Sequence, residues 1–215
     1  EGQDAEYRNS FITEGIRLSY YPRMNQRKNT DLLENKYRTY KKFKDMYKRE
    51  VIRILKNEKP TEENLAKLRE FAERHENYVV KPVYAAFGNG VRVENLGMYD
   101  SVEEAHQEYS KSGAVIEEVI VQGEALSKIH AGSVNTLRIP TAIIKNEEGE
   151  PEIKLFHPSI RMGRGDSFVD NFSAGGVSAL IDAETGVIYT DGADKKGHTY
   201  ECHPDSGIRF KGFQI

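Results

Sequence analysis

The chain has 215 residues and a formal net charge of −3, with 38% hydrophobic and 30% charged residues. This composition is typical of a soluble globular protein, and the net charge gives no signature of nucleic-acid binding. A single cysteine, Cys202, excludes an intrachain disulfide and favours a reducing compartment, so we expect a cytoplasmic protein. No apolar run approaches the roughly 18 residues that a membrane span needs, and no signal peptide is visible.

The N-terminal part is predicted to form an extended segment at residues 20–22, followed by a long helix. Thr30 is the expected N-cap of that helix, with Asp31 in its first turn. One face of the helix carries an apolar and aromatic stripe: Leu33, Tyr37, Tyr40, Phe43 and Tyr47. This spacing is more typical of a core than of a ligand site.

The same region is strongly basic, with twelve Lys/Arg against four Asp/Glu between Arg23 and Lys56. One interpretation is a solvated helix surface. The other is a patch that attracts an anionic substrate or a membrane surface. The sequence leaves both interpretations open.

Strands and helices alternate over the next 70 residues. Strands are predicted at 51–55, 78–83, 91–93 and 114–121. A helix opens at Pro60 and Thr61 with Leu65, Leu68 and Phe71 facing inward. A second helix starts at a capping box formed by Ser101 and Glu104.

The second half is predicted to be mainly antiparallel β. Residues 136–145 and 152–162 form one expected hairpin, with its turn at Glu148 and Gly149, and residues 177–181 and 187–190 form another. The whole chain is therefore expected to be α+β, with two lobes.

Lys81 lies in a short apolar strand, VVKPV, and a glycine-rich loop with Gly88 and Gly90 follows it. A half-buried lysine needs a partner, and phosphate is a suitable one. The glycines let backbone N–H groups approach phosphate oxygens. Alternatively, the lysine is a solvated edge charge and the glycines only form a hairpin turn.

A second motif, VIEEVIVQGE, places the adjacent residues Glu117 and Glu118 within an apolar strand. Their side chains point to opposite faces, so one of them enters the packed side and needs hydrogen-bond donors. The exocyclic amine of adenine or a ribose hydroxyl can supply these donors. Glu124 follows on the next loop. The alternative is that one glutamate is solvated and the other pairs with a lysine.

A third motif joins Arg138, in the string SVNTLRI, to Arg161 and to a loop with Asp170, Asn171, Gly175 and Gly176. Two arginines on neighbouring strands, followed by such a loop, can clamp a transferring phosphoryl group. Each arginine alone is typical of an ordinary surface charge.

Together these strings resemble the ATP-grasp superfamily, and most closely its sugar-transfer-associated branch, from about Asp31 to Ile215. The strings that carry the resemblance are NKY, VVKP, FGNG, VIEEVIVQGE, SVNTLRI and RMGRGDSFVDNFSAGGV. The resemblance implies an ATP-grasp fold with two α+β lobes and the nucleotide cleft between them. It also implies an N-terminal segment with an incomplete pre-ATP-grasp region over 1–36, a lid-like α+β subdomain over 37–118, and an incomplete antiparallel β-rich core over 119–215.

The resemblance assigns roles to individual residues. Lys36 and Lys81 would be the two lysines that bind the nucleotide phosphates, and the loop with Gly88 and Gly90 would close over them. The segment Glu117, Glu118, Val119 and Ile120 would line the adenine, and Glu124 would bind the ribose. Arg138 and Arg161 would contact the γ-phosphate or acyl-phosphate, and Asn171 would shape the acceptor side.

The implied function is an ATP-dependent ligase that joins a carboxylate to an amine through an acyl-phosphate, in polysaccharide or cell-envelope biosynthesis. ATP and Mg²⁺ are the expected cofactors, and the small-molecule substrates are expected to be sugar-linked. The Glu-x-Asn pair that binds Mg²⁺ in such enzymes does not occur after Arg161. We expect the metal ligands beyond Ile215, so their identity is unknown. The alternatives are a non-catalytic module that binds nucleotide or glycan, and a β-rich interaction domain.

Overall fold

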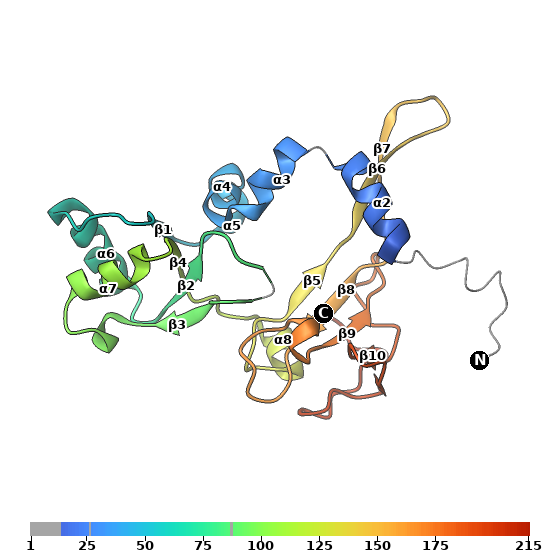
Figure 1. The fold of residues 1–215 in the computed structure, drawn as a ribbon. Helices are drawn as coiled ribbons and strands as arrows, with labels where there is room; N and C mark the ends of the chain where they lie inside the picture. The colour runs from blue at the N-terminus through green and yellow to red at the C-terminus, as the bar shows by residue number, and fades with distance from the viewer. Residues whose placement is uncertain (1–13, 26, 87) are drawn as a thin grey trace. The chain divides into compact units, whose positions relative to one another are not determined.

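The computed structural model describes residues 14–25, 27–86 and 88–215 (Figure 1). It divides into two compact units, one ending at Val119 and the other beginning at Ile120. Helices and strands alternate in the first unit, and strands dominate the second. None of the described helices combines the length and the apolar character that a membrane span requires.

The first unit is built on a four-stranded antiparallel sheet in the order β1-β4-β2-β3. Its strands are β1 (Val51–Ile54), β2 (Tyr78–Pro82), β3 (Arg92–Glu94) and β4 (Ala114–Glu118). Helices α6 (Glu62–Arg74) and α7 (Val102–Ser110) cover one face of this sheet. Their common core comprises Ile54, Leu68, Phe71, Tyr78, Val80, Ala105, Tyr109, Ala114 and Ile116. The four predicted strands are confirmed, although the last ends at Glu118.

Both helices begin where the sequence predicts. The Thr61 hydroxyl accepts a hydrogen bond from Asn64 N, and the Asn64 side chain accepts one from Thr61 N. The Ser101 hydroxyl likewise accepts from Glu104 N, but the Glu104 carboxylate accepts from Asp100 N instead of from the cap residue. Each cap satisfies backbone donors that the first helical turn leaves free.

The N-terminal elements differ from the prediction. Residues 20–22 belong to helix α2 (Glu14–Met24), where Pro22 lies in the last turn and supplies no backbone N–H to the hydrogen-bond ladder. The single helix from Thr30 is also wrong. Three helices occur instead: α3 (Arg27–Glu34), α4 (Lys36–Lys42) and α5 (Lys44–Tyr47). Asn35 interrupts the predicted helix, because its side chain accepts from Arg38 N and so caps α4. Leu33 is therefore 63% exposed.

The second unit contains a five-stranded antiparallel sheet in the order β11-β10-β9-β8-β5, and a separate ribbon of β6 and β7 (Figure 1). The strands are β5 (Thr136–Arg138), β6 (Thr141–Lys145), β7 (Pro151–Leu155), β8 (Ser159–Met162), β9 (Val177–Leu180), β10 (Gly192–Ala193) and β11 (Thr199–Tyr200). Helix α8 (Glu124–Ile129) precedes them. The core comprises Ile129, Ile160, Met162, Val177, Ala179, Ile181, Ile188 and Phe210.

The two long strands predicted at 136–145 and 152–162 are each broken in two. Pro140 separates β5 from β6, and Pro158 separates β7 from β8. Proline has no N–H to donate to a ladder, so each one ends a strand. The predicted turn is confirmed, with Gly149 at φ 83°. The second predicted hairpin is partly wrong, because residues 187–190 make only isolated bridges to Ile181 and Gln214.

Candidate functional site

The centre of the candidate site is the buried carboxylate of Glu117, which is 3% exposed. It lies on the sheet face opposite to α6 and α7, because β4 alternates and Ile116 enters the core. Lys81 pairs in register with Val115, two residues before Glu117, so the two charged side chains share one face. Lys81 Nζ donates to Glu117 Oε2 at 2.8 Å. This is the alternative in which a glutamate pairs with a lysine.

A second cation, Arg49, reaches the same carboxylate. Its Nε donates to Glu117 Oε2 at 3.0 Å, and its guanidinium lies over the Tyr47 ring at 4.2 Å from the centroid. Sequence analysis did not select Arg49. Only the pairing of β1 with β4, in which Val51 is opposite Glu117, brings Arg49 close.

Lys36 is the third cation of this group. It begins α4, and its Nζ donates to the Ala85 carbonyl at 2.6 Å. Burial lowers the pKa of Lys36, the ammonium of Lys81 lowers it further, and the Glu117 carboxylate opposes these effects. The structure thus brings three predicted site residues of the first unit together: Lys36, Lys81 and Glu117.

Charge in this group is unbalanced, because Lys81 and Arg49 both donate to the single carboxylate of Glu117 while Lys36 adds a third positive charge. An anion placed beside Lys36 and Lys81 would relieve their mutual repulsion. Phosphate oxygens suit lysine, which acts as a compact point charge with three donors. The residues present therefore fit the polyphosphate of a nucleotide. We name this group (Lys36, Arg49, Lys81 and Glu117) the cation group.

The glycine-rich loop connects β2 to β3, as the hairpin alternative anticipated. Gly88 and Gly90 have φ values of 78° and 70°, where side chains are disfavoured. A Cβ on Gly90 would also lie 2.8 Å from Pro82 Cγ, so the turn itself requires this glycine. Phe87 of the FGNG string lies outside the described residues. The role of this loop in binding phosphate stays a prediction.

The remaining predicted adenine-lining residues differ from Glu117 in their surroundings. Glu118 lies 3.7 Å from His75 Nε2, on the opposite sheet face from Glu117. Val119 and Ile120 follow the end of β4, with side chains 39% and 42% exposed. No contact of these three residues tests their assignment, so it stays a prediction.

In the second unit, Arg138 and Arg161 lie on one face of the β5–β8 pair. Thr136 is directly opposite Arg161, and Arg138 lies two residues further along β5. Arg161 Nη2 donates to the Thr136 hydroxyl at 2.8 Å and lies 3.3 Å from Asp170 Oδ2. Arg138 is exposed and forms no ion pair within the part of the chain that the structure describes. Of the two, Arg138 is the more available to an anionic ligand.

The other predicted residues of the second unit lie at helix starts and in turns. Glu124 is the first residue of α8 and forms an exposed ion pair with Lys128 at 3.0 Å. The Asn171 carbonyl accepts from Ala174 N and Gly176 N. A Cβ on Gly176 would lie 2.7 Å from the Asp170 carbonyl oxygen and 2.8 Å from that of Met162, so close backbone packing requires this glycine. The predicted convergence of Glu124 and Arg138 with Lys81 and Glu117 stays a prediction, because the two pairs belong to different units.

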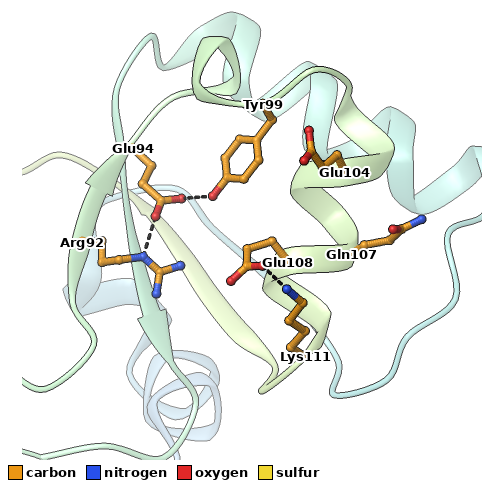
Figure 2. Close-up of a pocket in the computed structure, with 7 residues that line it drawn as sticks. All are labelled: Arg92, Glu94, Tyr99, Glu104, Gln107, Glu108 and Lys111. Atoms are coloured by element: carbon orange, nitrogen blue, oxygen red, sulfur yellow. Dashed lines mark hydrogen bonds and ion pairs between the residues drawn. The ribbon is translucent and has the colours of Figure 1, made fainter.

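A polar pocket of about 370 Å³ lies in the first unit, away from the cation group, and is lined by Arg92, Glu94, Tyr99, Glu104, Gln107, Glu108 and Lys111. Figure 2 shows the Glu94 carboxylate between Arg92 and Tyr99, each of which donates a hydrogen bond to it. Burial and the bond to Glu94 raise the pKa of Tyr99 to about 12, so it remains a donor. The best donors and the buried carboxylate of this pocket are therefore already paired with one another.

Sequence analysis also missed a buried histidine cluster in the second unit. His203 Nε2 donates to the Gly163 carbonyl at 2.9 Å, and His130 Nε2 lies 3.1 Å from the Gly165 carbonyl. The Ser133 hydroxyl accepts from Gly163 N and lies 3.0 Å from His130 Nδ1. These bonds fix the segment that directly follows Arg161. Isolated histidines far apart in sequence give no signal of such a cluster.

The burial of His203 gives the folded state a pH-dependent stability. Burial lowers the pKa of His203 below its ordinary value, so the unfolded chain takes up a proton at a higher pH than the folded chain. Above about pH 7 the His203 imidazole is mostly neutral in both the folded and the unfolded chain. As the pH falls below about 6.5, the free energy of unfolding decreases, and this decrease ends once the pH is below the pKa of His203 in the folded chain. We expect His203→Asn to remove up to about 1.4 kcal/mol per pH unit of this slope, measured by urea unfolding between pH 7.5 and 5. His157 is exposed, so the variant His157→Asn should retain the slope. An unchanged slope in His203→Asn would show that His203 is not the source of the pH dependence.

Comparison with known proteins defines the class to which this fold belongs, the ATP-grasp proteins. The family model for sugar-transfer associated ATP-grasp matches residues 16–215, and the chain belongs to this family. Its fold is accordingly α+β and of the ATP-grasp type.

Among solved structures, the crystal structure of D-cycloserine synthetase DcsG is similar to 98% of this chain over 73% of its own chain, with 13% sequence identity and a TM-score of 0.46. A likeness this distant transfers no residue roles. No curated protein matches the chain.

Proposed function

We propose that this chain is the nucleotide-binding core of an ATP-dependent ligase that joins a carboxylate to an amine. Membership of the ATP-grasp family supports the ligase class. The observation that carries the nucleotide assignment is the cation group, in which Arg49 and Lys81 donate to the single buried carboxylate of Glu117 and Lys36 adds a third positive charge. The family's association with sugar transfer supports substrates that carry a sugar, in polysaccharide or cell-envelope biosynthesis.

The reaction of this proposal proceeds in two balanced steps. A carboxylate oxygen forms a bond to the γ-phosphorus of ATP as ADP leaves, which gives an acyl-phosphate. The amine nitrogen then attacks the carbonyl carbon, inorganic phosphate leaves, and the amine proton passes to solvent. Little covalent chemistry falls to the protein, so its contribution is positioning and charge neutralisation.

In this proposal, the contacts that each basic residue makes in the structure decide its role. Lys36 and Lys81 bind the polyphosphate, and Arg49 helps to hold Glu117 so that Lys81 stays in place. Arg138, which is exposed on β5, binds the oxygens of the phosphoryl group that is transferred. Arg161 is held by Thr136 and Asp170, so we assign it to positioning β5 against β8.

Mg²⁺ neutralises phosphate charge in ATP-grasp enzymes. In the described ranges, no three His, Cys, Asp or Glu side chains gather in a way that could hold a metal ion. The ligands of Mg²⁺ stay a prediction.

Two measurements on the full chain test the proposal. Thermal unfolding with and without Mg·ATP tests binding, since a ligand at 100 times its Kd adds about 2.7 kcal/mol to folding stability. A coupled assay for ADP then tests catalysis with sugar-linked carboxylates, offered with and without amines. ADP release that requires both substrates supports the ligase. Stabilisation by nucleotide without ADP release from any pair favours the non-catalytic binding module, and no stabilisation refutes the nucleotide assignment.

A further inference from the structure

Four lysines in α4, in α5 and at the position that caps the end of α5 carry positive charge that the nucleotide proposal does not use. Lys41, Lys42, Lys44 and Lys48 are all exposed, and we call them the lysine surface. Within the described ranges, none of the four ammonium groups is paired with a carboxylate. A single acid, Asp45, lies within this stretch of eight residues.

Among the exposed lysines in or directly after the described helices, only those of the lysine surface lack a carboxylate partner. Nearby, Arg38 pairs with Asp31 and Arg49 with Glu117. Exposed lysines on or directly after the other helices have carboxylate partners three or four residues away: Lys67 with Glu63, Lys111 with Glu108, and Lys128 with Glu124. Such pairs belong to ordinary solvated helix faces. The lysine surface lacks them, so its charge is available to an external anion.

An exposed apolar side chain accompanies these charges. Met46 lies between Lys44 and Lys48 in sequence and is 78% exposed. The aromatic rings of the same helices instead pack on one another, with centroid distances of 5.9 Å for Tyr37–Tyr40 and 5.4 Å for Tyr40–Tyr47. The segment therefore exposes an apolar side chain to solvent among its lysines.

We propose that the lysine surface and Met46 dock on a bilayer that contains anionic phospholipid. Lysines beside an anionic leaflet bind its phosphate groups, and an apolar side chain among them enters the interface. The net charge of −3 opposes any general attraction to such a bilayer, so binding has to come from a local surface. Lys36 donates to the Ala85 carbonyl and Arg49 to Glu117, so neither belongs to the lysine surface.

Sedimentation of the full chain with vesicles tests this proposal. We expect binding to vesicles of phosphatidylglycerol and phosphatidylcholine, no binding to phosphatidylcholine alone, and weakening with added salt. Each lysine beside an anionic surface contributes on the order of a fivefold gain in partitioning. Replacing all four lysines of the surface with glutamine should therefore lower binding by at least about a hundredfold. Met46→Ser alone should lower vesicle binding several-fold, and its effect should be clearest at high salt, where the contribution of the lysine charges is screened.

The matched control replaces Lys56, Lys59, Lys195 and Lys196 with glutamine, which changes the net charge equally at exposed positions elsewhere. This variant should keep vesicle binding, and circular dichroism should show that all variants are folded. Equal loss in the control would overturn the proposal, as would equal binding to phosphatidylcholine. Binding to soluble heparin without binding to anionic vesicles would also overturn it, in favour of a polyanion partner. Because the assay contains no nucleotide, its outcome is independent of the ligase proposal.

Discussion

Lys36→Met should lower the affinity of the chain for ATP by about tenfold to a hundredfold, without lowering its thermal stability. A hydrogen bond to a charged group contributes roughly 1.5–3 kcal/mol, and Lys36 is the member of the cation group with no carboxylate of its own. Its ammonium is repelled by Lys81, so its removal relieves repulsion in the protein without nucleotide. Isothermal titration with ATP and thermal unfolding measure the two effects separately.

Lys42→Met is the matched control, because Lys42 ends the same helix and its side chain is exposed. It should leave ATP affinity unchanged. If Lys36→Met bound ATP as tightly as the unmodified chain, the cation group would not be the phosphate site. Loss of affinity together with a large loss of thermal stability would instead indicate that Lys36 is structural.

Glu117→Ala should have the largest effect on stability, a loss of about 3 kcal/mol. Removing one partner of a buried ion pair leaves the remaining charges uncompensated, and here both Lys81 and Arg49 lose their acceptor. Urea unfolding followed by circular dichroism measures this loss, since the chain has no tryptophan to report by fluorescence. Pyrophosphate should restore part of the stability, because it supplies the missing negative charge between the two cations.

Glu118→Ala is the natural comparison, because Glu118 neighbours Glu117 on the opposite sheet face and its side chain is 32% exposed. It should cost less than 1 kcal/mol. Equal losses in the two variants would show that the pairing of Glu117 with Lys81 and Arg49 contributes little. If pyrophosphate stabilised Glu117→Ala more than ATP did, the result would favour a Glu117 carboxylate that also contacts the adenine, which pyrophosphate lacks.

In the first unit, the sequence predicted the starts of helices well where the signal was a capping side chain that bonds to the backbone a few residues away. The caps at Thr61 and Ser101 fixed the starts of α6 and α7, because a side-chain oxygen there satisfies backbone donors of its own first turn. The same kind of signal was overlooked at Asn35, where a cap inside an apolar stripe ended the predicted helix. Pro140 and Pro158 likewise broke two predicted strands for a reason visible in the sequence.

The sequence by itself determined the ATP-grasp family and the α+β class, and it selected Lys81 and Glu117 as candidates, because these depend on residue types in local strings. Only the tertiary structure decided that Glu117 accepts hydrogen bonds from Lys81 and Arg49, and that Lys36 joins them. Strand register sets these contacts, and register depends on how β1 and β2 align with β4 across more than 30 residues of chain. No local string carries that alignment, so the partners of a buried charge become known only when the sheet is formed.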